Sequence, residues 1–90
     1  LEKLDMMIFL DLEKKIAKER QSLAKSIAKY DEKPKKQEKL GLEIVEQATA
    51  LLALLDQAKS RAIQSGKSDL VPHYEQIVFE VDEIRKNYRQ

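Results

Sequence analysis

Residues that break helices are scarce along this chain. Two prolines and two glycines are spread over ninety residues. The rest is rich in Leu, Ala, Glu, Lys, Gln and Arg, and Pro34 and Gly66 divide it into three uninterrupted stretches. Most of these residue types favour helix, whereas proline and glycine mark helix ends and turns. The chain is therefore expected to be all-α, with one helix in each stretch.

Apolar residues recur at helical spacing in all three stretches, which predicts helices over about 4–31, 35–65 and 69–89. In the second stretch they recur at alternating steps of four and three, the heptad spacing that is typical of coiled coils. These positions are Ile44, Ala48, Leu51, Leu55, Ala58 and Ala62, with Val45, Leu52 and Ile63 widening the stripe. The third stretch repeats the pattern from Leu70 to Tyr88.

Short connections around Pro34 and Gly66 predict an antiparallel up-down-up three-helix bundle, a single domain over residues 1–90. The alternative is a long helical hairpin of the first two helices, completed by the third helix of a second copy in a dimer. Heptad seams fit both arrangements. Because the sequence begins with Leu1 and not Met, we expect a processed chain or a fragment of a longer protein.

The helix ends give sharper local expectations. Gly66 suits the left-handed residue that follows a helix, and Asp31 or a neighbour is expected to cap the second helix. Asp69 as N-cap of the third helix would place Pro72 at its third position, where the missing N–H does no harm. Gly41 lies on the apolar side of the second helix, and we interpret it as a close helix–helix approach and not a helix end.

Four polar residues fall inside the predicted apolar stripes, and all are expected to be partly buried: Glu19, Ser26, Lys59 and Arg85. Lysine and arginine can bury their stems and keep the charge in water. Glu19 is expected to pair with Lys59 or Arg85 across the bundle.

Little in the sequence indicates catalysis. The chain has no cysteine, and His73 is its only histidine. No Glu-x-x-His motif and no glycine-rich phosphate loop is present. We interpret His73 as an ordinary boundary residue and expect no enzyme activity, metal or cofactor. The apolar runs are too short to span a membrane, and the lack of cysteine fits a reducing, cytoplasmic location.

Several large apolar residues point away from the predicted stripes: Met6, Met7, Leu10, Leu54 and Phe79. A helix that is apolar around its circumference is either central in a fold or covered by another chain. Because the start of the first helix should lie near the end of the second, Met7 and Leu54 are expected to be close. These residues predict a module that binds another protein or itself.

A lysine-rich connector supports an alternative function. Lys33, Lys35, Lys36 and Lys39 crowd around the first turn, with Lys29 nearby. Several concentrated cations are what binding to a phosphate backbone requires. The alternative is therefore an accessory protein that binds nucleic acid or another anionic surface through these lysines.

The second half of the chain resembles the BAG domains, through Leu54-Leu55-Asp56 late in the second helix and an amphipathic third helix after a short turn. The resemblance implies a helical bundle that contacts heat-shock chaperones. The basic pair that this family carries near the start of its last helix is absent here, because Pro72, His73 and Tyr74 occupy those positions.

Overall fold

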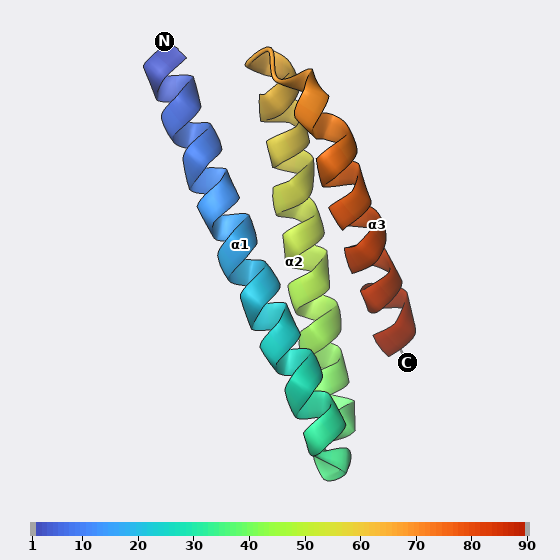
Figure 1. Cartoon of the computed structure of the whole chain (residues 1–90). Coiled ribbons are helices and arrows are strands. Elements are labelled where there is room, and N and C mark those ends of the chain that lie inside the picture. The colour runs from blue at the N-terminus through green and yellow to red at the C-terminus, as the bar shows by residue number, and fades with distance from the viewer. Residues whose placement is uncertain (1, 90) are drawn as a thin grey trace.

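Three long helices run alternately up and down (Figure 1). The computed structural model describes residues 2–89, with the side chains of all of these except 2 and 5. The helices are α1 (Glu2–Glu32), α2 (Gln37–Gln64) and α3 (Val71–Tyr88), and the 3-10 turns η1 (Pro34–Lys36) and η2 (Ser68–Leu70) precede α2 and α3. The prediction of an antiparallel three-helix bundle is confirmed, with α3 packed on α2 of its own chain.

The end of α2 is closed by backbone hydrogen bonds around Gly66. This glycine has φ of +72°, as expected for the residue after a helix end. Its N–H donates to the carbonyl of Ile63 at 3.3 Å, and the N–H of Lys67 donates to the carbonyl of Ala62 at 2.7 Å. Together these two bonds form a Schellman motif, which satisfies carbonyls that the helix itself leaves free.

The predicted N-caps are wrong. Asp31 lies inside α1, and Asp69 lies in η2, while α3 begins at Val71 with Pro72 in its first turn. Neither Lys33 nor Leu70, which precede η1 and α3, makes a side-chain capping bond. The 3-10 turns replace the caps, because each closes with a backbone bond of its own, 3.0 Å long in both cases. A tight turn of this kind leaves no need for a carboxylate cap.

Helix α2 lies between the other two helices and carries the most deeply buried side chains. Six of its residues have no exposed surface: Ile44, Ala48, Leu51, Leu55, Ala58 and Ala62. Three of the six are alanines, which let a neighbouring helix come close, and α2 continues unbroken through the buried Gly41. The heptad seam of α2 is therefore the centre of the core, as predicted.

Long side chains make the contacts between α1 and α3. The rings of Tyr30 and Tyr88 meet edge to face at 4.8 Å, and those of Phe9 and Tyr74 at 6.3 Å. Both helices pack their backbones closely on α2 and not on each other. Large side chains between α1 and α3 and small ones on α2 account for this arrangement, since side-chain size at the contact sets the distance between helix axes.

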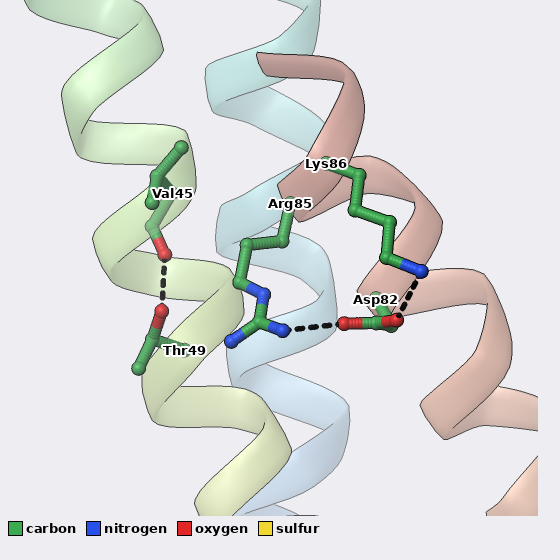
Figure 2. Close-up of polar contacts among 5 residues, drawn as sticks. All are labelled: Val45, Thr49, Asp82, Arg85 and Lys86. Atoms are coloured by element: carbon green, nitrogen blue, oxygen red, sulfur yellow. Dashed lines mark hydrogen bonds and ion pairs between the residues drawn. The ribbon is translucent and has the colours of Figure 1, made fainter. Parts of the chain in front are cut away.

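The four polar residues predicted to be partly buried are so. Ser26 is buried, and Glu19, Lys59 and Arg85 are half-buried. The prediction that Glu19 pairs with Lys59 or Arg85 is wrong, because no ion pair joins Glu19 to either cation among the described residues. Arg85 binds Asp82 on its own helix instead, with Nη2 and Oδ1 2.6 Å apart (Figure 2). Lys86 Nζ lies 3.2 Å from the other oxygen of Asp82. Hydrogen bonds from Lys86 and Arg85 lower the pKa of Asp82.

Within residues 2–89, no helix combines the length and the apolar character needed to cross a lipid bilayer.

The alanine positions of α2 give a test of this packing. Ala48→Leu should lower the free energy of unfolding by about 1–3 kcal/mol, because the larger side chain has no room beside α1 and α3. Ala50→Leu on the exposed side of α2 is the matched control and should change it by less than about 0.5 kcal/mol. Urea unfolding followed by circular dichroism measures both, and equal effects would contradict the central position of α2.

Candidate partner-binding surface

The predicted partner residues do not gather in one patch. Met7 and Leu10 line a groove between α1 and α2, and Met6 is exposed on α1 near them. Leu54 is half-buried and packs against the core. Phe79 is 68% exposed on α3 and does not line this groove. The structure therefore separates the five residues into a site on α1, a core residue and a single ring on α3.

The groove between the start of α1 and the end of α2 has a volume of about 840 Å³. We call it the α1–α2 groove. On the α1 side it is lined by Leu4, Met7, Ile8, Leu10, Asp11, Leu12, Lys14 and Lys15, and on the α2 side by Asp56, Gln57, Ser60, Arg61 and Gln64. The expectation that the start of the first helix lies near the end of the second is confirmed. One wall of the groove is mainly apolar and the other is polar.

Three apolar side chains of the α1 wall are strongly exposed. Leu4 is 58%, Met7 67% and Leu10 51% exposed. Sequence reasoning identified Met7 and Leu10 but missed Leu4, although Leu4 precedes Met7 by three residues and so shares its side of the helix. Exposed apolar residues grouped beside a groove are typical of interaction sites, and methionine adapts its shape to different partners.

Charged residues border the apolar wall. Asp11 and Lys15 pair within α1 at 3.3 Å, so the two charges largely offset each other. Lys14 is exposed on the same wall, and Lys3 and Lys18 are exposed on α1 nearby. Among the side chains that the structure describes, the border of the apolar wall on α1 is therefore mainly basic.

Leu54 and Ile63 differ from their predicted placement. Leu54 was expected to be off the core face but packs against it, whereas Ile63 was expected to widen the core stripe but is 60% exposed. Because α2 packs on two neighbours, its buried sector is wider than that of a helix with one neighbour. Ile63 lies in the last turn of α2, and its side of the helix is left uncovered there.

The face between α1 and α3 is crossed by polar contacts and holds two small hollows, of about 140 and 160 Å³. Arg20 Nη2 lies 3.8 Å from Glu80 Oε2, and the Tyr74 hydroxyl donates to Glu13 Oε1. His73 borders the smaller hollow and is exposed. Among the described residues, no group of three or more His, Cys, Asp or Glu could hold a metal ion.

The lysine-rich connector forms a second exposed feature at the opposite end of α2. Lys35, Lys36 and Lys39 line a shallow hollow of about 380 Å³ together with Glu38 and Leu42. Lys33 precedes η1 and is exposed. The four lysines predicted for anion binding thus lie close together, from the residue before η1 to the first turn of α2, and all four are exposed.

Comparison of the chain with protein-family models, with curated proteins and with solved structures gives no match. The likeness to BAG domains therefore stays an expectation from the sequence.

The contact between Tyr74 and Glu13 predicts a dependence of stability on alkaline pH. Burial of Tyr74 and its hydrogen bond to Glu13 raise the pKa of the phenol above its usual value of about 10. The folded state keeps this proton while the unfolded state loses it, so the stabilisation is complete below about pH 10 and is lost as pH rises further.

The free energy of unfolding of the wild-type chain should therefore fall more steeply above about pH 10 than that of Tyr74→Phe, which has no proton to lose. Glu13→Gln keeps the phenol and should give an intermediate slope, because burial remains and the acceptor charge is gone. Urea unfolding at several pH values measures the slopes. Identical slopes for wild type and Tyr74→Phe would show that this contact is unimportant.

Proposed function

We propose that the chain is a non-enzymatic helical binding module. It holds the surface of another protein, or of a second copy of itself, against the α1–α2 groove. The observation that supports this most is the exposure of Leu4, Met7 and Leu10 along one wall of that groove. A cytoplasmic location and an adaptor role belong to the same proposal.

The physical basis is the apolar surface that these side chains leave in water. Complete burial of a leucine or methionine side chain contributes about 1.5–3 kcal/mol. Because Leu4, Met7 and Leu10 are between 51% and 67% exposed, covering one of them contributes roughly 1–2 kcal/mol to association. The polar wall of the groove, with Gln57, Ser60 and Gln64, offers hydrogen-bonding groups to a partner backbone or side chain. A site of this kind fixes a partner by apolar contact on one side and orients it by polar contact on the other.

Site-specific cross-linking tests the groove directly. With a photo-reactive phenylalanine at Leu10, irradiation in native cells should give adducts heavier than the chain, which mass spectrometry then identifies. The same probe at Gln21, exposed farther along α1 and outside the groove, is the matched control. Absence of any adduct specific to position 10 would overturn the proposal.

Substitution of Met7 measures the energetic contribution of the groove. Met7→Glu should weaken the adduct-forming interaction about ten- to a hundredfold, since it replaces apolar contact by a charge that must be desolvated. Gln21→Glu adds the same charge outside the groove and should leave the affinity nearly unchanged. Both variants should keep the helical content of the wild type, because both positions are exposed.

A second candidate function is supported by the lysines of the connector. Lys35, Lys36 and Lys39 surround one hollow, and Lys33 adds a fourth cation beside it. Binding to single- or double-stranded DNA should then be detectable at low salt and weaken steeply as salt rises, because phosphate contacts release counterions. Fluorescence anisotropy at two salt concentrations measures this. Lack of binding at low salt, or equal binding by Lys35→Glu/Lys36→Glu, would exclude it.

A further inference from the structure

The outer side of α3 presents an exposed aromatic ring between two acids. Phe79 is 68% exposed, and Glu75 and Glu83 are exposed four residues before and after it. Residues four apart lie in one row along a helix. Lys86 lies on the same side of α3, and its ammonium group already forms an ion pair with Asp82. Among the described side chains, no ion pair joins Glu75 or Glu83 to a cation.

The apolar wall of the α1–α2 groove has the complementary pattern. Lys3 lies four residues before Met7, and Lys14 lies four residues after Leu10, so two cations bracket two apolar side chains in one row of α1. All four residues are exposed. Asp11 is already paired with Lys15, and within the described chain no acid pairs with Lys3 or Lys14.

The spacings of the two patterns match within one helical turn. Glu75 and Glu83 are about 12 Å apart along α3, and Lys3 and Lys14 are about 16 Å apart along α1, at 1.5 Å per residue. Flexible lysine and glutamate side chains can cover the difference. The groove beside Met7 and Leu10 holds about 840 Å³, which is ample space for one phenyl ring.

From these complementary charges and shapes, we propose that the occupant of the α1–α2 groove is Phe79 of a second copy of this chain. Glu75 and Glu83 of that copy then lie against the basic border that Lys3 and Lys14 form. This inference rests on the proposed function and names its partner.

The two contacting surfaces differ, so a single contact leaves the Phe79 of one copy and the groove of the other unused. Two copies either exchange Phe79 across a two-fold axis and close as a dimer, or further copies add one after another into a larger ring or an open filament. A symmetric contact between two α1 helices is disfavoured. Antiparallel pairing of Met7 with Leu10 would place Lys3 of one copy opposite Lys14 of the other, and like charges in contact repel.

Sedimentation velocity over micromolar to millimolar concentrations at low salt tests the proposal. The average mass of the wild-type chain should rise with concentration to that of two chains or more, and it should fall on addition of salt, which screens exposed charges. A mass that stays at one chain over this range would overturn the inference.

Charge reversal on one surface at a time identifies the contact. Glu75→Lys/Glu83→Lys and Lys3→Glu/Lys14→Glu should each weaken self-association at least about tenfold. Mixing the two variants should restore it, because each variant then supplies the surface that the other needs. Glu32→Lys/Glu46→Lys makes the same change of net charge as Glu75→Lys/Glu83→Lys at exposed sites elsewhere; it is the control for that variant and should associate like the wild type.

Phe79→Ala should weaken association about tenfold without any change of charge. Circular dichroism checks that every variant keeps its helices. Equal association by the single-surface variants, or no rescue on mixing, would refute the contact. If the chain is monomeric but the probe at Leu10 links it to a different protein, this inference fails and the proposed function stands. If position 10 gives no adduct, both fail.

Discussion

The packing of α1 and α3 on the small residues of α2 is the constraint on which the rest of the structure depends. Ala48, Ala58 and Ala62 have no exposed surface, and they allow both neighbours to approach the central helix. Helices α1 and α3 contact each other through tyrosine, phenylalanine and long polar side chains, which keep their backbones apart. The close packing of helix backbones in the bundle is therefore on α2. The outer sides of α1 and α3 are then left for solvent or for a partner.

This arrangement explains why the exposed apolar residues lie where they do. Over most of its length α1 buries one stripe against α2 and α3, and the residues opposite are charged or small. Near the start of α1 the opposite side carries Met7 and Leu10, and the end of α2 beside it is polar. The apolar surface is therefore left uncovered by the chain's own core, and this is the physical ground of the proposed binding role.

How much of this was predictable depends on the scale of the feature. The three helices, the continuity of α2 through Gly41 and the partial burial of Ser26 and Arg85 all follow from periodicity within single helices. The predicted polar partners, an N-cap for the third helix and a cation for Glu19, were wrong. Asp69 does not cap α3, because it lies in η2, which closes with a backbone bond of its own. Arg85 binds Asp82 of its own helix and not Glu19.

The sequence by itself determined the helices, their order and the stripe that each one buries, since these depend on residue spacing and on the two turns. Only the tertiary structure decided that Leu54 packs on the core, that Ile63 is exposed and that Met7 and Leu10 share a groove with the end of α2. The physical reason is that exposure depends on how many neighbours a helix has and where they end. Residue spacing gives the direction of a side chain and not what lies opposite it.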